Sequence, residues 1–304
     1  MEKELSHEQV ISTSRLTKAF DTLVAVNDLH LEVLRGDVFG FLGPNGSGKT
    51  TTMRLMLGLL RPLAGRITVL GNEVPRDAAR VLARVGFVPE QPHLDPLLSV
   101  RETLAFHAAF YRTWDWPWAE RLLVQFGLED RQPFGRLSKG QKGKVMMLLA
   151  LAQRPELLVL DEPTDGLDPV VRRDVLSALL DYVAQRHATV IISSHLVHEL
   201  ERFCDWIGVM DDGRLITEVP MQRFKNGIKR LRIGGTPTTR DDTPFVLLGR
   251  EPSDGAGETW LVRDWEPQMA SYFEDAGVSL HAVLDLDLEE GFVELLRTFR
   301  GTRA

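Results

Sequence analysis

A chain of 304 residues has room for one large domain, or for a main domain with an appendage. Hydrophobic residues make up 43% and charged residues 26% of the chain, which is the composition of a globular protein that can bury a full core. The net charge of −7 argues against nucleic acid as the main partner, because a face that neutralises phosphates usually shows as a basic excess.

Neither a secretory nor a membrane-spanning pattern is present in the sequence. The single cysteine, Cys204, excludes an intramolecular disulfide and fits a reducing cytosol. Met1 to Val10 is charged and polar, so we expect no signal peptide there. Because no apolar run approaches the ~20 residues that cross a bilayer, we expect any work at a membrane to be done from outside the bilayer.

The N-terminal segment has the pattern of two strands behind a solvated start at residues 1–9. Val10 to Leu16 and Leu29 to Leu34 are predicted strands on either side of Thr17 to Asp28. Phe20 lies in this intervening segment. Its ring could stack on an adenine or could be a core or turn residue, and the sequence favours neither.

A phosphate-binding loop follows. Gly43 to Thr50 has the form GxxxxGK[ST], preceded by an apolar strand at Val38 to Leu42 and followed by helical periodicity from Thr51 to Leu60. Backbone N–H groups and a helix N-terminus would meet a phosphate there. The motif places Lys49 at the β- and γ-phosphates and the Thr50 hydroxyl at Mg²⁺. The sequence therefore predicts nucleotide binding.

Residues 92–150 form a mainly helical insert between strands. Strands are predicted at Gly65 to Gly71 and Gly86 to Pro89. Ser99 to Glu102 has the capping-box form and predicts a helix that continues to Phe110. Trp114 to Trp118 interrupts the pattern, and helices are predicted at Ala119 to Phe126 and at Lys142 to Gln153. Leu137 to Gln141 precedes the last helix, and taken alone it is a plain helix cap at Ser138.

Two acidic residues follow a second apolar strand. Leu157 to Leu160 has the composition of a strand that is buried on both faces of a parallel sheet. Asp161 and Glu162 then stand at its carboxyl end, where open α/β sheets place their ligands. We expect Asp161 to orient Mg²⁺ and its waters, and Glu162 to polarise the attacking water as general base.

The next elements repeat this arrangement. Thr164 to Pro169 is a turn cluster, Val170 to Arg186 a helix, and Thr189 to Ser194 another buried strand. His195 ends that strand, and a lone histidine is as often a packing or surface residue as a catalytic one. A helix from Val197 to Phe203 and a hairpin at residues 206–217 close the segment.

After Phe224 the composition changes, and residues 225–304 are predicted to be a small α+β domain. Gly234 to Pro244 has the composition of a linker or loop. Short strands and two helices follow, the last at Leu288 to Phe299. The acidic residues around Asp285 to Glu290 indicate a solvated face rather than a metal site.

Taken in order, these motifs resemble the nucleotide-binding subunit of an ABC transporter over about residues 10–224. The resemblance implies an α/β P-loop NTPase of the ABC ATPase type, with a mainly parallel core sheet, an antiparallel β region and the helical insert. The motifs are the aromatic A-loop Phe20, Walker A at Gly43 to Thr50, the Q-loop Gln91, the signature at Leu137 to Gln141, Walker B with its base at Leu157 to Glu162, the D-loop at Thr164 to Asp168, and the H-loop His195.

The resemblance also implies a role for each motif. Phe20 would stack on adenine, while Gln91 would touch Mg²⁺ or the attacking water, beside Thr50 and Asp161. His195 would hold the γ-phosphate and the water, completing a catalytic set with Glu162 and Lys49. The residues expected to contact ATP are Phe20, Gly43, Pro44, Asn45, Gly46, Ser47, Gly48, Lys49, Thr50 and Thr51, together with Ser138, Gly140, Gln141 and Asp168 of a second subunit.

In this family the signature of one subunit closes over the ATP of another. The resemblance therefore implies a dimer, most simply a homodimer, and a separate integral-membrane permease. The chain would be an ATPase on the cytoplasmic face of the cell membrane. Lys139 stands where the usual LSGGQ signature has glycine, and such variants resemble the ATPases of bacterial ABC-2 type exporters. If this position needed a positive φ, lysine would cost about 1 kcal/mol or more; in a first helical turn it would be acceptable.

Other readings of the sequence remain open. A soluble ABC-type ATPase acting on ribosomes or DNA usually carries two nucleotide-binding halves or a long coiled-coil insertion, whereas this chain has one Walker A and no heptad run. A GTPase should show an Asn-Lys-x-Asp motif, and none is present. A small-molecule kinase would not need Ser138 to Gln141 or His195. Intact Lys49, Asp161 and Glu162 argue against an inactive regulatory subunit.

Overall fold

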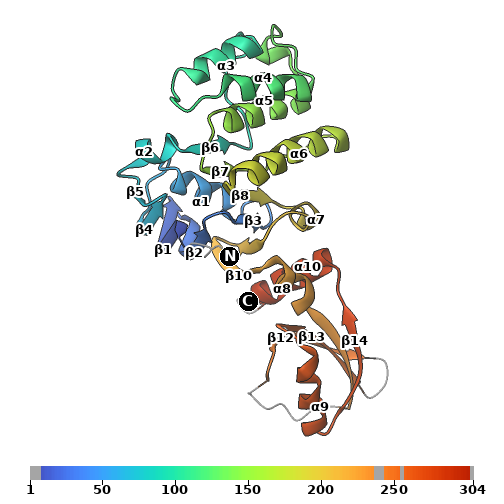
Figure 1. Ribbon diagram of the computed structural model, residues 1–304. Coiled ribbons are helices and arrows are strands. Elements are labelled where there is room, and N and C mark those ends of the chain that lie inside the picture. Colours follow the sequence, from blue (N-terminus) through green and yellow to red (C-terminus); the bar gives the residue numbers. More distant parts are fainter. Residues whose placement is uncertain (1–7, 236–242, 254–256, 302–304) are drawn as a thin grey trace, which may run out of the picture. The chain divides into compact units, whose positions relative to one another are not determined.

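The computed structural model describes residues 8–235, 243–253 and 257–301 (Figure 1). A six-stranded sheet in the order β10-β9-β3-β8-β7-β6 carries the predicted motifs. Its strands are β3 (Val38–Leu42), β6 (Val85–Val88), β7 (Leu157–Leu160), β8 (Thr189–Ser194), β9 (Trp206–Asp211) and β10 (Arg214–Pro220). Strands β3, β8, β7 and β6 run parallel. Every residue of β3, β7 and β8 is buried, so these apolar runs form the interior of the sheet and their carboxyl ends share one edge.

A second, antiparallel sheet has the order β2-β1-β4-β5. Its strands are β1 (Gln9–Phe20), β2 (Leu23–Leu34), β4 (Ala64–Val69) and β5 (Asn72–Val74). The prediction that Thr17 to Asp28 separates two short strands was wrong, because β1 and β2 continue through it and pair as far as Phe20 with Leu23. The register of β1 shifts between Thr13 and Leu16, so the alternation of apolar residues is lost beyond that point.

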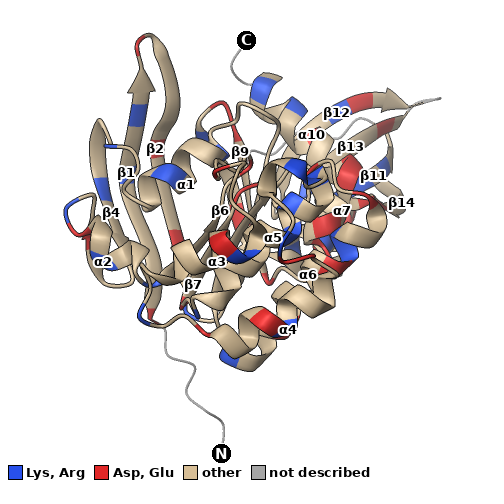
Figure 2. Cartoon of the chain, turned by 90° about the horizontal axis from the view of Figure 1, so that it is seen from above, with Lys and Arg blue, Asp and Glu red and all other residues tan. Residues whose placement is uncertain are grey.

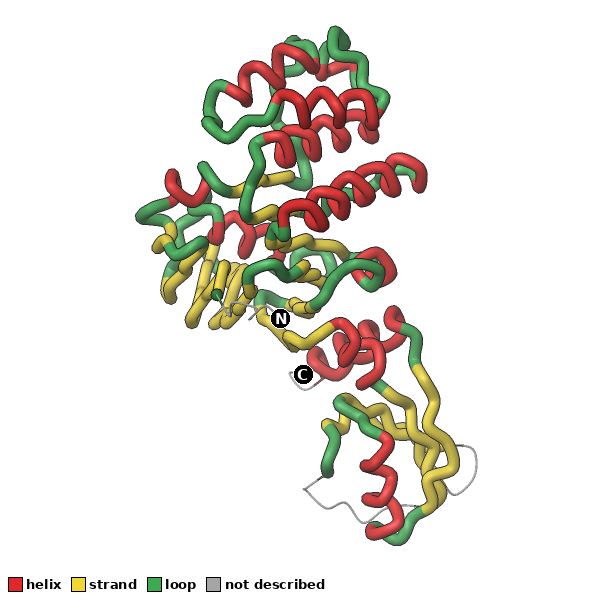
Figure 3. Tube along the Cα trace, in the orientation of Figure 1, coloured by secondary structure: helices red, strands yellow, loops and turns green. Residues whose placement is uncertain are grey.

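Helices cover the core sheet and form the insert (red in Figure 3). They are α1 (Lys49–Met56), α2 (Ala78–Leu82), α3 (Val100–Ala108), α4 (Trp116–Phe126), the 3₁₀ turn η1 (Phe134–Arg136), α5 (Lys139–Ala152) and α6 (Pro169–Arg186). Basic and acidic residues are mixed on α3, α4 and α6 (Figure 2).

Two predicted helix starts in the insert were too late. Helix α4 begins at Trp116 rather than Ala119, because Asp115 caps it by accepting a hydrogen bond from the Trp118 N–H at 2.9 Å and Pro117 is tolerated in a first turn. Helix α5 begins at Lys139, three residues before the predicted Lys142. The capping box predicted at Ser99 is confirmed.

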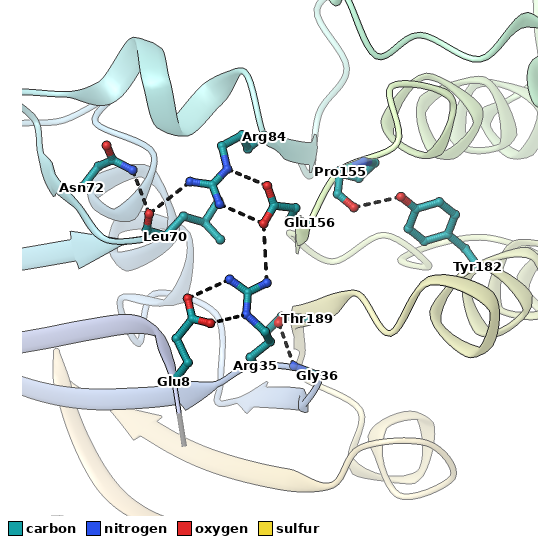
Figure 4. A network of polar contacts seen from close by, with 10 residues as sticks. All are labelled: Glu8, Arg35, Gly36, Leu70, Asn72, Arg84, Pro155, Glu156, Tyr182 and Thr189. Carbon is teal, nitrogen blue, oxygen red and sulfur yellow. Dashed lines mark hydrogen bonds and ion pairs between the residues drawn. The ribbon is translucent and has the colours of Figure 1, made fainter. Parts of the chain in front are cut away.

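A network of ion pairs lies at the amino ends of the parallel strands, opposite the phosphate loop (Figure 4). Arg84 binds Glu156 through two hydrogen bonds of 2.6 and 2.8 Å, and Arg35 contacts both Glu156 and Glu8. The hydrogen bonds from Arg84 hold the pKa of Glu156 below its usual range. These contacts join Glu8, the residue before β1, to the turn before β3 and to the residues that precede β6 and β7.

The chain divides into two compact units. The first contains Met1–Leu196 and Gly208–Glu218, and the second contains Val197–Ile207 and Val219–Ala304. The second unit therefore takes in segments that the sequence-based boundary at residue 224 placed with the first domain.

The second unit has an antiparallel sheet in the order β12-β13-β11-β14. Its elements are α7 (Val197–Leu200), α8 (Met221–Gly227), β11 (Lys229–Gly234), β12 (Val246–Ser253), β13 (Gly257–Arg263), η2 (Pro267–Ala270), α9 (Ser271–Asp275), β14 (Ser279–Asp285) and α10 (Leu288–Gly301). Phe245, Trp260 and Phe273 form its aromatic core. The solvated start at residues 1–9 and the linker at Gly234 to Pro244 lie largely outside the described residues.

Candidate active site

The phosphate loop joins the buried strand β3 to helix α1. Gly46 and Gly48 have φ values of 81° and 107°, which side chains other than glycine rarely adopt. A Cβ atom at Gly43 would collide with the carbonyl oxygen of Met210, and one at Gly48 with that of Ala25. Ser47 is buried, and its Oγ has no hydrogen-bond partner within the described part of the chain. The loop therefore presents polar groups and a helix N-terminus to one side, which suits a phosphate.

Lys49, the first residue of α1, points back over this loop. Its Nζ donates hydrogen bonds to the carbonyls of Gly43 at 2.6 Å and Pro44 at 3.2 Å, and it lies 3.4 Å from Glu162 Oε1. Burial lowers the pKa of Lys49, and the charge of Glu162 opposes that shift. The ammonium is thus held at the mouth of the loop by acceptors that a phosphate oxygen can replace.

Asp161 is buried at the end of β7, where the sequence predicted it. Its Oδ1 accepts hydrogen bonds from Thr50 Oγ1 at 3.1 Å and from Ser193 Oγ at 2.8 Å. A carboxylate and a hydroxyl oxygen are donors that suit Mg²⁺, which usually binds one or two protein oxygens together with substrate phosphates. The described residues contain no group of three or more His, Cys, Asp or Glu side chains that could hold a metal ion, so nucleotide oxygens would complete the coordination.

Glu162 brings the second carboxylate of the pair to the same place. Its N–H donates to Ser193 Oγ at 2.9 Å, and its Oε2 lies 3.0 Å from Nδ1 of His195. Its φ of 47° is uncommon for a residue with a side chain, and such strain clusters at functional sites. His195, Glu162 and Lys49 therefore form one chain of contacts. Ser193, which binds the Asp161 carboxylate and the Glu162 backbone N–H, was missed because it occupies a buried strand position with no local pattern.

A cavity of about 540 Å³ extends from the phosphate loop. Its phosphate end is lined by residues 45–51 and Glu162. Its other end is lined by Phe20, Leu23, Val24 and Ala25, with Asp212 and Gly213 beside them. Phe20 is 42% exposed, and Lys18 Nζ lies 4.9 Å from its ring centroid. An apolar wall next to a phosphate cradle suits a nucleotide base, and Leu23 and Val24 were not predicted to belong to it.

Glu90, and not the predicted Gln91, lines this cavity. The negative charge of Glu90 is among those that oppose the downward pKa shift of Lys49. Gln91 is exposed, and the contact that the structure shows there is made by its backbone carbonyl, 2.9 Å from Nδ1 of His93. The structure therefore does not bring the Gln91 side chain together with Thr50 and Asp161.

The residues around Ser138 lie apart from this cavity, at the start of α5. Ser138 and Gln141 form a capping box, in which each accepts a hydrogen bond from the other's backbone N–H. Lys139 is the first residue of the helix, so it carries no cost of a positive φ. A Cβ atom at Gly140 would lie 3.2 Å from Val171 Cγ2, so glycine lets α5 approach α6. Asp168 caps α6 through the N–H groups of Val170 and Val171.

A strand, a phosphate loop, a helix and two carboxylates at the carboxyl edge of a parallel sheet define a P-loop nucleoside triphosphatase. The ABC transporter family profile matches residues 26–165. The chain is 38% identical over 300 residues to the Nod factor export ATP-binding protein I of Cupriavidus pinatubonensis, covering 94% of this chain and 90% of that protein. It is 35% identical over 218 residues to the bacitracin transport ATP-binding protein of Bacillus licheniformis, covering 71% of each.

Solved structures of ABC transporter ATP-binding subunits are also similar to this chain. An ATP-binding subunit of an ABC transporter superposes with a TM-score of 0.65 at 27% identity, covering 71% of this chain and 92% of that one. The cbiO1 protein of Clostridium perfringens, part of an ABC transporter complex, gives 0.61 at 27% identity, covering 71% and 90%.

This chain belongs to the ABC transporter family, as an ATP-binding subunit with ATPase activity. The predicted fold class is confirmed with it. No helix among the described residues is both long and apolar enough to cross a membrane.

Proposed function

We propose that this chain powers an exporter by closing as a dimer around ATP and driving a separate membrane subunit. The observation that carries the proposal is the contact of Glu162 with both Lys49 and His195 at the phosphate loop. A carboxylate between these two groups supports the proposal, because the terminal phosphate and its attacking water would meet there. Export is favoured by the Nod factor export relative, because that match extends through the second unit of this chain.

Each residue of the site has its own role in the hydrolysis of ATP. The loop N–H groups and Lys49 hold the β- and γ-phosphates, and Phe20 stacks on the base. Thr50 and Asp161 would hold Mg²⁺, which would neutralise charge on the phosphates when bound. Glu162 polarises the attacking water, and His195 orients Glu162 through Nδ1 while its other ring nitrogen remains available to the γ-phosphate.

A second copy completes each site. Ser138, Lys139, Asp165 and Asp168 are exposed and lie outside the cavity of their own chain. The start of α5 offers free N–H groups and a helix dipole, which suit the γ-phosphate of another subunit's ATP. Because this chain carries every motif that such a closure needs, a homodimer with two competent sites is the simplest assembly.

The helical insert provides a docking face for the membrane subunit. Leu97, Phe106 and Phe110 are 83%, 59% and 69% exposed, and the rings of Phe106 and Phe110 pack edge to face at 5.2 Å. Large apolar side chains that protrude together are typical of an interface. We therefore place the protein on the cytoplasmic face of the membrane, bound through this insert.

Affinity purification of the full-length Glu162→Gln protein with ATP tests the proposal. The variant should bind ATP, barely hydrolyse it and co-purify from gently solubilised membranes with a multi-span membrane protein in stoichiometric amount. Lys49→Ala is the matched control, since it should not form the ATP-held complex. A dimer that captures ribosomal or other cytosolic partners, and no membrane protein, would instead identify a soluble ABC-type ATPase.

A further inference from the structure

Lys139 makes an ion pair that links the start of α5 to the turn after the catalytic carboxylates. Its Nζ lies 3.2 Å from Asp165 Oδ2. The two side chains are 64% and 46% exposed. Gly166 lies beside the pair with a φ of 63°, a backbone conformation that favours glycine, and the Lys139 ammonium lies close against it. The ammonium therefore packs against this turn as well as pairing with Asp165.

The turn that Lys139 contacts also holds Glu162. The N–H of Asp165 donates to the carbonyl of Glu162 at 3.1 Å, closing the turn directly on the residue with the positive φ. A second cavity of about 330 Å³ lies here, lined among others by Lys139, Asp165 and Glu162. Glu162 and Glu90 line both this cavity and the phosphate cavity. A short path of contacts thus runs from Lys139 to the phosphate site of the same chain.

We propose that Lys139 exchanges anions: it pairs with Asp165 in the separate chain and with the γ-phosphate of the second copy's ATP in the closed dimer. This inference rests on the proposed closure of two copies. In leaving Asp165, Lys139 frees the turn that positions Glu162, so that ATP bound by one copy acts on the catalytic carboxylate of the other. Lys139 is in this sense a positioning residue for Glu162 and a ligand for the partner's nucleotide.

The chemistry of the two anions favours this exchange. Exposed ion pairs contribute little to stability, so the contact with Asp165 is easily given up. A triphosphate carries more charge than one carboxylate, and at the start of α5 the helix dipole adds to the field of the ammonium. The glycine usual at this position in the family can offer only a backbone N–H, whereas Lys139 adds a full positive charge.

Dimerisation of the full-length chain tests the exchange. The ATP concentration that half-saturates dimer formation is measured by sedimentation velocity in the Glu162→Gln background. Lys139→Gln should raise this concentration about tenfold, because it loses a charge-assisted phosphate contact. Asp165→Asn should lower it about threefold, because the ammonium is released from its competing partner. In the double variant Asp165→Asn should have no further effect, since it acts only through Lys139.

Control variants separate this exchange from a general effect of charge. Lys139→Arg should behave like the parent, and Lys142→Gln should change the half-saturating concentration much less than Lys139→Gln, because Lys142 lies over the ring of Phe134 at 5.6 Å. Equal effects of the Lys139 and Lys142 variants, or an Asp165→Asn effect that persists without Lys139, would overturn the proposal while leaving the dimer intact. If the parent itself fails to dimerise with ATP, the proposed closure fails, and the exchange fails with it.

Discussion

Lys49 Nζ lies 3.4 Å from Glu162 Oε1, and both side chains are almost completely buried, at 5% and 9% exposure. The attraction between the two charges is therefore the main term that offsets the free-energy cost of burying each of them. A γ-phosphate that binds Lys49 must share it with Glu162, so nucleotide entry brings two negative groups together unless a divalent cation offsets them. This relationship governs the first two predictions.

Replacing Glu162 by glutamine should lower the turnover of ATP at least about hundredfold, because a general base is lost while the shape of the side chain is kept. The affinity for ATP should hold or improve, since the neutral amide no longer repels the γ-phosphate. Single-turnover hydrolysis and titration with a fluorescent ATP analogue measure the two effects separately. Turnover at the wild-type rate would refute the assignment of Glu162 as the base.

Lys49→Ala should weaken ATP binding and also lower stability, by about 3 kcal/mol, because Glu162 is left as a buried charge without its cation. Isothermal titration with ATP and thermal unfolding measure the two losses. Lys225→Ala is the control, since it removes a half-buried ammonium that pairs with Glu201 at 2.7 Å in the second unit, away from the phosphate loop. Nucleotide binding unchanged in the Lys49 variant would rule out the phosphate-loop assignment.

Glu90→Ala should reduce hydrolysis and raise the Mg²⁺ concentration needed for half-maximal rate, each by about tenfold, as expected for a polar group that supports a metal site. Gln91→Ala should leave both nearly unchanged, because its side chain does not face the cavity. Steady-state rates across a magnesium titration compare the two variants. A large loss in the Gln91 variant alone would restore the assignment made from the sequence.

Glu218 makes the free energy of unfolding of the protein depend on pH. Burial raises the pKa of this carboxyl to about 7, and the nearby charge of Glu32 adds to the shift. Between pH 4.5 and 7 the folded chain therefore holds this proton more tightly than the unfolded chain, and the free energy of unfolding falls as the pH rises. Glu218→Gln should stabilise the protein at pH 8 by on the order of 1 kcal/mol, allowing for solvent screening.

Denaturant unfolding at two pH values checks the direction in which the free energy of unfolding changes with pH. The gain from Glu218→Gln should be present at pH 8 and much smaller at pH 4.5, where Glu218 is protonated in the folded chain and about half protonated in the unfolded chain. Glu32→Gln should give a smaller gain at pH 8, because it removes the neighbouring charge but leaves the burial. A gain of equal size at both pH values would trace the effect to packing instead of titration.

Much of the fold followed from the sequence, because buried parallel strands are continuous apolar runs and the catalytic groups follow them directly. This rule predicted Asp161 and Glu162, whereas the role of His195 was implied only by the family resemblance. The role of Gln91 was implied by the family resemblance, and the presence of Glu90 in the cavity was not foreseen, because the backbone direction after β6 leaves no trace in composition. Strand β11 was missed since Lys229, Arg230 and Arg232 lowered the apolar signal of a half-exposed sheet.

The close approach of Gly140 to Val171 has a consequence for how variants of this protein are selected. A methyl group at position 140 would crowd the Val171 side chain, which would have to shift by a few tenths of an ångström, whether or not Gly140 ever meets a phosphate. An inactive Gly140→Ala protein should therefore acquire suppressors, and the shortest route is Val171→Ala, which returns the lost space. Recovery of ATPase activity in that double variant would assign this glycine to helix packing, and the two positions would then be expected to vary together among functional chains.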